Sequence, residues 1–215
     1  GGSPQSGAPP FVVRPPRITV GRMNLVQELT RLLGADRVDT TGAALAQHSR
    51  GESYAEAVSP AVVVYPQTTE EVSRLLRFAS ENGVPVTPVA ANSSLEGHTV
   101  PVRGGISLDL GRMDRIVESR PEDLLIVVQP AVTYPRVNDH VRRHGLFFPI
   151  DPGAHASIGG MVSTNASGTA AVRYGTTGDY VLGLEVVTPT GEVLRLGNRA
   201  RKSASGYDLC ALLTG

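Results

Sequence analysis

Hydrophobic and polar positions follow a clear order in the second quarter of the chain. Residues 61–65 read AVVVY, a β-branched run typical of a buried strand. Thr68 and Glu71 then have the spacing of a capping box, and the helix that they begin should end near Gly83. A second strand at 84–87 completes a β-α-β unit. The inward face of the helix is predicted to carry Val72, Leu75, Leu76 and Ala79.

Similar patterns predict further helices and strands on both sides of this unit. A helix is predicted over 25–33, with Asn24 as its N-cap and Gly34 as its stop. Another begins at Tyr134 and ends at Gly145. Further strands are predicted over 105–110, 124–129, 181–188 and 192–196, the last two as a hairpin, whereas 35–58 shows little periodicity. This mixture predicts an α+β fold with two subdomains.

These elements suggest a division of the chain. We expect a flexible tail at 1–20, an N-terminal helical segment at 21–59 and a domain at 60–215, made of a first subdomain at 60–110 and an incomplete second subdomain at 124–215. The stretch 111–123 between the subdomains is charged and irregular. Because the sequence ends abruptly at Gly215, two residues after Leu212 and Leu213, we expect a piece of a longer protein.

Composition excludes several classes of protein. The chain has 20 basic and 20 acidic residues, so its zero formal net charge offers no electrostatic footprint for nucleic acid. Its single cysteine, Cys210, cannot form an internal disulfide and is predicted to be a small core residue. No apolar run reaches the length of about 20 residues that spans a bilayer. We expect a cytoplasmic protein, or one that is peripheral at the inner membrane.

The histidines and a short basic run offer little specific chemistry. His140 and His144 are four residues apart on a predicted helix, but the arginines between them favour a solvated face, and we expect no metal site. His98 and His155 lie in or beside loops of small residues and are candidates for ligand contact. The basic residues Arg199, Arg201 and Lys202 form either a solvated edge or a surface that faces a phosphate or a carboxylate.

Two stretches of small residues are the strongest candidates for a binding site. Residues 88–98 read PVAANSSLEGH, and residues 152–168 are rich in Gly, Ser, Thr and Asn. Small residues let consecutive backbone N–H groups approach an anion closely. Taken singly, the first could be an ordinary surface loop and the second a sharp turn. Together they favour one shared ligand, with a diphosphate as the first candidate.

Neither stretch has a familiar nucleotide-binding fingerprint. The chain lacks G-x-G-x-x-G between a strand and a helix, and it lacks G-x-x-x-x-G-K-[ST]. These absences disfavour a Rossmann domain and an NTPase.

Several long motifs nevertheless resemble one flavoprotein superfamily. They read VTPVAANSSLEGH, GGISLDLGRMDRI, FFPIDPGAHASIGGMVSTNASGTAAVRYGTT and LGLEVVTPTGEVLRLG. From about residue 60 to residue 215, the sequence resembles the FAD-binding domain of the vanillyl-alcohol oxidase and p-cresol methylhydroxylase superfamily. Within it, the chain is most similar to FAD-linked D-lactate dehydrogenases of the cytochrome type, with glycolate oxidase flavin subunits and D-2-hydroxyglutarate dehydrogenases nearby.

The resemblance implies an FAD held between two α+β subdomains, and it implies which residues bind it. The first stretch would wrap the pyrophosphate through backbone amides, and the second would line the rest of the cofactor. The implied residues are Pro88, Ala90, Ala91, Asn92, Ser93, Ser94, Gly97 and His98, with Pro152, Gly153, Ser157, Ile158, Gly159, Gly160, Thr164, Ala166, Ser167 and Gly168. Valine at 159 or 160 is expected to abolish FAD retention, because its side chain would enter the cofactor's space.

The chain departs from the pattern of the superfamily in three respects. In the largest, the superfamily continues past residue 215 with a Ser-Glu-Gly-Thr segment that completes the flavin site and with a separate substrate domain. Ala90 and Asn92 stand where the first loop usually has glycines, and alanine restricts φ there. Ala131 stands where a glycine is common, in Gln-Pro-Gly-Val.

The resemblance also implies an activity. In the whole enzyme, flavin N5 would accept a hydride from the α-carbon of a small D-2-hydroxy acid, which a separate substrate domain would bind. Electrons would then pass to a quinone, a cytochrome or another flavoprotein. We assign no catalytic acid or base to this sequence and expect it to be inactive alone. The alternatives are an FAD-binding module without activity of its own, or another oxidoreductase of the superfamily, such as an alkyl-dihydroxyacetonephosphate synthase.

Overall fold

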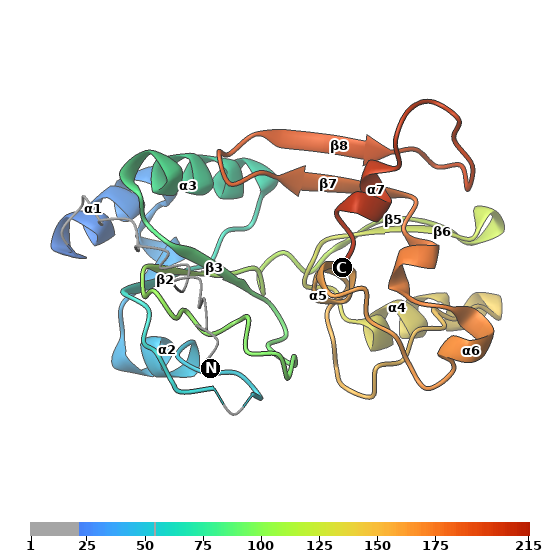
Figure 1. Cartoon of the computed structure of the whole chain (residues 1–215), viewed down its shortest axis with the longest axis horizontal. Helices are drawn as coiled ribbons and strands as arrows, with labels where there is room; N and C mark the ends of the chain where they lie inside the picture. The colour runs from blue at the N-terminus through green and yellow to red at the C-terminus, as the bar shows by residue number, and fades with distance from the viewer. Residues whose placement is uncertain (1–21, 54) are drawn as a thin grey trace, which may run out of the picture.

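The computed structural model describes residues 22–53 and 55–215, so the predicted tail at 1–20 lies outside the described residues. Figure 1 shows two groups of elements side by side, with a long hairpin above both. The strands are β1 (Val38–Asp39), β2 (Val62–Val64), β3 (Val86–Val89), β4 (Ile106–Asp109), β5 (Ile116–Arg120), β6 (Leu125–Val128), β7 (Gly183–Val187) and β8 (Val193–Gly197). The α-helices are α1 (Arg22–Leu33), α2 (Gly42–Gln47), α3 (Thr69–Asn82), α4 (Tyr134–Val141), α5 (Ile158–Ser163), α6 (Ala171–Tyr174) and α7 (Leu209–Leu212). Single turns of 3-10 helix span Ala35–Arg37, Pro121–Asp123, Arg142–His144 and Thr177–Tyr180.

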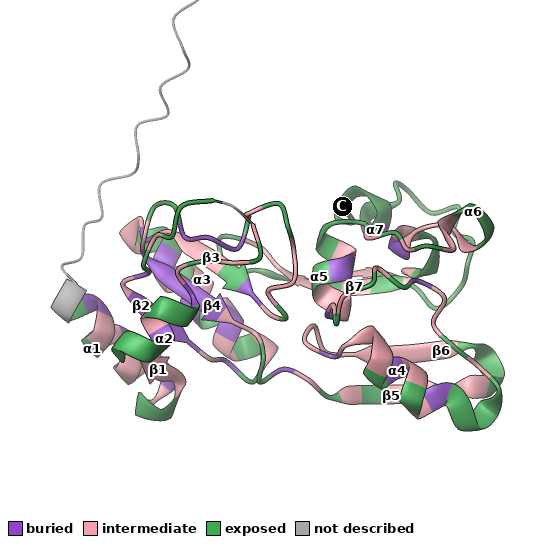
Figure 2. Ribbon diagram, turned by 90° about the horizontal axis from the view of Figure 1, so that it is seen from below, coloured by how far each residue is buried: buried purple, intermediate pink, exposed green. Residues whose placement is uncertain are grey.

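The first group is built on a four-stranded sheet with the order β1-β2-β4-β3. Strands β2, β4 and β3 are parallel, and β1 pairs antiparallel with β2. Helices α1 and α3 contribute Leu29 and Leu75, which are fully buried against strand residues such as Ile106. Each such side chain stabilises the fold by about 1.5–3 kcal/mol relative to an exposed one. Figure 2 shows the buried residues concentrated on these strands and on α3.

The predicted β-α-β unit is confirmed. The hydroxyl of Thr68 caps α3 by accepting a hydrogen bond of 3.2 Å from the N–H of Glu71. Gly83 ends the helix in the left-handed conformation, with φ 63°. The flanking strands form one or two residues from their expected places, as β2 and β3. The prediction for α1 was wrong at its start, because the helix begins at Arg22 and Asn24 therefore lies inside it.

Elements that the sequence did not predict form where pairing with distant segments replaces local periodicity. Strand β1 and helix α2 lie within 35–58, and β5 lies within the stretch 111–123, which was expected to be irregular. Strand β5 forms because it pairs antiparallel with β6, from Ile116 opposite Val128 to Arg120 opposite Leu125. The predicted strands at 105–110, 124–129, 181–188 and 192–196 are confirmed as β4, β6, β7 and β8.

The β7–β8 hairpin connects the two groups of elements. It lies beside α3 in Figure 1, far from α3 in the sequence. The hydroxyl of Ser73 donates a 2.5 Å hydrogen bond to the carbonyl of Gly191 at the tip of the hairpin. Thr69 donates another, of 2.6 Å, to the carboxylate of Glu185 on β7. The hairpin therefore holds the second group of elements against the first.

Candidate cofactor site

The first loop, residues 88–98, leaves the sheet at the carboxyl end of its parallel strands. Val89, the last residue of β3, lies opposite Asp109, the last residue of β4. Figures 1 and 2 both place the chain that follows β3 on the side of the first group that faces α5. The edge formed by strand carboxyl ends is where open α/β sheets commonly bind ligands.

The backbone of this loop offers a run of free donors. The N–H groups of residues 90–94 donate no hydrogen bond to any described residue. The N–H of Glu96 is satisfied locally by the hydroxyl of Ser94, at 3.3 Å. Consecutive free N–H groups are a suitable donor set for a phosphate, and the small side chains around them leave room for it.

The backbone of Asn92 has a conformation that suits an anion-binding loop, as the sequence allowed. It takes the left-handed conformation with φ 53°, which glycine adopts without strain. Asparagine tolerates this conformation better than most residues. Ala90 is not among the residues with positive φ, so alanine fits the backbone at that position.

The second segment, residues 152–168, is not the simple turn that its composition suggested. It contains α5, whose N-cap is Ser157, and Ser157 accepts a 3.4 Å hydrogen bond from the N–H of Gly160. The hydroxyl of Thr164 donates to the carbonyl of Gly160 at 3.1 Å. Small and hydroxyl-bearing side chains therefore satisfy the ends of a short helix here.

Two glycines of this segment are required by the protein itself. A Cβ atom on Gly159 would lie 2.6 Å from the Cβ of Pro130 and 2.9 Å from its carbonyl oxygen. A Cβ on Gly168 would lie 2.4 Å from the carbonyl oxygen of Asp151. Gly160 is different, because an added Cβ would meet only the hydroxyl of Ser157, at 3.0 Å. Of these three glycines, only Gly160 is not required by packing within the protein, so close approach to a ligand can explain it.

The free backbone donors of the second segment are scattered, whereas those of the first loop are consecutive. The N–H groups of Ile158 and Gly159 donate to the carbonyls of Val132 and Pro130, at 2.7 and 2.8 Å. The N–H of Ala166 donates to Met161, and that of Gly153 donates to the Asp151 carboxylate. Among the described residues, five N–H groups of the segment donate no hydrogen bond. They belong to residues 154 and 155 and to Ser157, Ser167 and Gly168.

Most of the predicted site residues are accessible or partly accessible. His98 and His155 are both exposed, and Nδ1 of His98 lies 3.5 Å from the hydroxyl of Ser94. Exposed predicted residues are Pro88, Ala91, His98, Gly153, Gly160, Thr164 and Ser167; half-buried ones are Ala90, Asn92, Ser93, Ser94, Gly97, Pro152, Ile158, Gly159, Ala166 and Gly168; Ser157 is buried.

The basic run that was left open after the hairpin contains one defined contact. Arg199 donates two hydrogen bonds, of 3.0 and 2.6 Å, to the carboxylate of Glu118 on β5. These bonds, together with Arg120, hold the pKa of Glu118 below its usual value. Arg199 thus faces a carboxylate of the same chain. Cys210 is buried, as predicted, and burial raises the pKa of its thiol.

Residues preceding the predicted domain contact the first loop. The side-chain amide of Asn92 donates a 3.0 Å hydrogen bond to the carbonyl of Arg50. A Cβ on Gly51 would lie 2.8 Å from the hydroxyl oxygen of Thr99. Sequence reasoning missed Arg50 and Gly51 because the stretch around them has no hydrophobic period.

His48, two residues before Arg50, pairs with a carboxylate of the sheet. Nε2 of His48 lies 2.8 Å from the Asp109 carboxylate, and Nδ1 lies 2.8 Å from the carbonyl of Ala44. Both partners are acceptors, so both ring nitrogens of His48 serve as donors. The hydrogen bond to Asp109 raises the pKa of His48 although burial opposes it. Tyr65 packs edge-on against the ring at 6.0 Å, and burial raises the pKa of its phenol.

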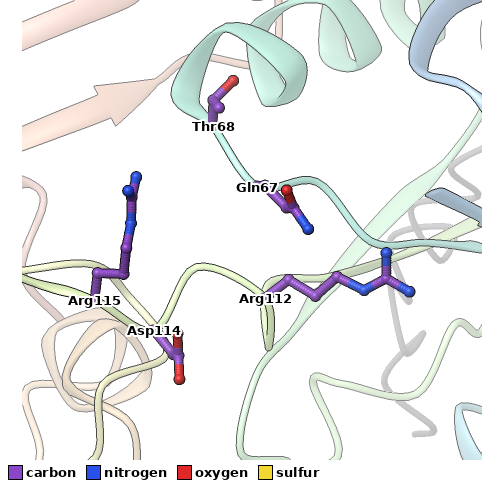
Figure 3. Close-up of a pocket in the computed structure, with 5 residues that line it drawn as sticks. All are labelled: Gln67, Thr68, Arg112, Asp114 and Arg115. Carbon is purple, nitrogen blue, oxygen red and sulfur yellow. The ribbon is translucent and has the colours of Figure 1, made fainter. Parts of the chain in front are cut away.

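A pocket of about 400 Å³ lies elsewhere, at the start of α3 (Figure 3). None of the predicted site residues lines it. Its charged side chains already have partners: Arg112 donates to the carbonyl of Asp36, Arg115 to Gln129, and Asp114 pairs with Arg136. The pocket is lined by Gln67, Thr68, Arg112, Asp114 and Arg115. These contacts give it a structural explanation, and we assign no ligand to it.

The arrangement of sheet, hairpin and α5 defines a class of protein: the p-cresol methylhydroxylase type of FAD-binding fold. A solved structure of p-cresol methylhydroxylase with substrate bound has a TM-score of 0.74 and 26% sequence identity, and the match covers 92% of this chain and 41% of that chain. The predicted α+β fold of this type is confirmed.

The chain belongs to the FAD binding domain family, which matches residues 60–197. The cytochrome D-lactate dehydrogenase of Arabidopsis thaliana mitochondria is 46% identical over 164 residues, covering 76% of this chain and 29% of that protein. A probable mitochondrial D-lactate dehydrogenase of Danio rerio is 40% identical over 194 residues, and the match covers 89% of this chain and 39% of that protein. The chain thus spans less than half the length of these relatives.

The cofactor predicted from the sequence, FAD, is confirmed by this family membership. The residues present fit its diphosphate, because the first loop combines free backbone N–H groups with a left-handed residue and small side chains. Among residues 22–53 and 55–215, no helix has both the length and the apolar character needed to cross a membrane.

Proposed function

We propose that this chain is the FAD-binding portion of a flavin-dependent dehydrogenase that oxidises a small D-2-hydroxy acid, with D-lactate as the first candidate. The observation that carries the proposal is the 46% identity to a cytochrome D-lactate dehydrogenase over 76% of the chain. When bound, FAD supplies the hydride acceptor for oxidation of the substrate's α-carbon.

The role of this chain's residues in that reaction is to hold and orient the cofactor. The first loop would bind the diphosphate through the N–H groups of residues 90–94. Because these groups have no acceptor among the described residues, they support the placement predicted from the sequence. The second segment would line the remainder of the cofactor around Gly160 and the free N–H groups of Ser167 and Gly168. Binding through backbone dipoles needs no lysine or arginine and suits a chain of zero net charge.

The partners of the whole protein are part of the same proposal. A small 2-hydroxy acid would bind to a separate substrate domain, and electrons would pass to a cytochrome, a quinone or another flavoprotein. The name of the Arabidopsis relative includes a cytochrome, which favours the first acceptor. We also propose a location in the cytoplasm or peripheral at the inner membrane. The names of both relatives described above include the word mitochondrial, which does not favour the cytoplasm.

Titration of the purified chain with FAD tests this proposal. We expect quenched flavin fluorescence, a shifted visible absorption band and near-stoichiometric retention of FAD after gel filtration. D-lactate, L-lactate and glycolate are then added with an artificial electron-accepting dye. Reduction of the dye by D-lactate alone would support the dehydrogenase directly, whereas a chain that retains no FAD would contradict the proposal.

A second candidate is an FAD-binding module without activity of its own. The observation that favours it is the share of the relatives that this chain spans, 29% and 39%. Stoichiometric FAD without dye reduction by any of the three acids would favour the module.

A further inference from the structure

We propose that residues His48–Ser53, named here the base segment, are part of the FAD site. Gly51 lets the base segment pack closely against the first loop, and His48 is a positioning residue that fixes the base segment to the sheet. The base segment precedes residues 60–197, which match the family, and no prediction from the sequence included it. The inference rests on the proposed role of the first loop in holding FAD.

The base segment touches the first loop at both of its bends. At the left-handed residue Asn92, the side-chain amide donates to the carbonyl of Arg50 at 3.0 Å. At Gly97, which has φ 73°, an added Cβ would lie 3.2 Å from the hydroxyl of Ser53. The two bends that shape the loop therefore rest on one short piece of chain.

Gly51 lies against the side chains of Thr99 and Asn92. A Cβ atom there would lie 2.8 Å from the Thr99 hydroxyl oxygen and 3.0 Å from Oδ1 of Asn92. Both oxygens are buried and have no hydrogen-bond partner among the described residues. Unpartnered buried oxygens are uncommon in folded proteins and often mark functional sites. Any side chain at 51 would push on Asn92, and through it on the N–H groups of residues 90–94.

His48 fixes the base segment to the strand beside the loop. The His48 side chain is 4% exposed, and its two nitrogens are held by α2 and by Asp109. Asp109 ends β4 and pairs in register with Val89, the residue directly before the free N–H groups. The ion pair and the loop thus share one edge of the sheet, and His48 positions the base segment relative to β3.

The test compares two glycine-to-alanine variants that differ in their surroundings. Gly51→Ala should raise the dissociation constant of FAD at least tenfold, measured by quenching of flavin fluorescence. Gly42→Ala is the control, because an added Cβ there meets nothing within 4 Å. ADP, which also contains a diphosphate, should lose affinity in parallel. The melting temperature of each apoprotein shows whether the fold is intact.

A second pair of variants decides the question if Gly51→Ala does not fold. His48→Ala should weaken FAD binding at least tenfold, and His48→Gln, which can still donate to Asp109, should recover part of it. Dissociation constants within twofold of wild type for the folded Gly51→Ala or His48→Ala variant would overturn the inference alone. A wild-type chain that binds no FAD would overturn the proposed function as well.

Discussion

At the scale of single residues, Asn92 shows how one backbone conformation limits the choice of side chain. Its φ of 53° lies in the left-handed region, where a residue with a Cβ atom is strained. Glycine avoids this strain, and asparagine tolerates it while its amide bonds to Arg50.

We expect Asn92→Ala to weaken FAD binding more than Asn92→Gly does. Both changes remove the hydrogen bond to Arg50, but only alanine adds left-handed strain, about 1 kcal/mol. We expect the loop of the alanine variant to relax from this conformation when FAD is absent, so that binding has to restore it at a further loss of about fivefold in affinity. Flavin fluorescence titration measures both variants, and equal affinities would contradict the role of strain at this position.

Gly159 and Gly160 should respond differently to substitution although they are neighbours. Gly159→Ala would force a Cβ to 2.6 Å from Pro130 and should lower the free energy of unfolding by about 1–3 kcal/mol. Gly160→Ala should leave stability nearly unchanged, and Gly160→Val should lose FAD while the protein still folds. Urea unfolding and FAD titration separate the two effects. An equally unstable Gly160→Ala variant would show that both glycines are structural.

The His48–Asp109 pair predicts a dependence of stability on pH. The pKa of His48 is raised above its ordinary value of 6.5, mainly by the hydrogen bond to Asp109. The stabilisation of the folded state by protonated His48 is therefore complete below the pKa of His48 in the unfolded chain. It is lost as pH rises through the higher pKa of His48 in the folded chain. The free energy of unfolding should be higher for wild type than for His48→Gln. This difference should be larger at about pH 6 than at about pH 9. Urea unfolding at both pH values checks this, and a difference that grows with pH would refute it.

At the scale of elements, the contact of the β7–β8 hairpin with α3 joins two parts of the molecule that the sequence keeps apart. Gly191 at the hairpin tip is buried and has φ 82°. An added Cβ there would lie 2.5 Å from the carbonyl oxygen of Ser73 and 2.8 Å from the Cβ of Arg77. The tip therefore fits α3 only without a side chain.

Gly191→Ala should therefore destabilise the protein by about 2–4 kcal/mol, from backbone strain and from the clash with α3. Gly104→Ala is the matched control, because Gly104 has a similar φ of 65° but nothing within 4 Å of an added Cβ. It should cost about 1 kcal/mol. Chemical denaturation of both variants gives the difference, and equal losses would mean that the hairpin tip can move away from α3.

At the scale of the whole molecule, FAD should stabilise the folded chain because the proposed site, formed by both groups of elements, exists only in the folded state. FAD at about 100 times its dissociation constant adds about 2.7 kcal/mol to the free energy of unfolding. For a chain of this size, that should raise the melting temperature by about 5–10 °C. Thermal unfolding followed by circular dichroism with and without FAD measures the shift. No shift at saturating FAD would mean that the unfolded chain binds the cofactor equally well.

The amino-acid sequence by itself determined the elements with a strong local period. The β-branched run before Thr68, the amphipathic helix that ends at Gly83 and the later hairpin could all be predicted, because neighbouring residues specify them. Several motifs along residues 60–215, through their resemblance to a flavoprotein superfamily, also predicted FAD, which family membership confirms. These features depend on residues that are close together in the chain.

Only the tertiary structure decided which distant residues meet. The contact of Asn92 with Arg50 spans 42 positions, and Gly159 owes its lack of a side chain to Pro130. Strand β5 and the pairing of His48 with Asp109 likewise form from stretches with little periodicity of their own. Packing and hydrogen bonding between distant segments leave no repeat in the sequence, so the contacts that support the cofactor loop became visible only once the chain was folded.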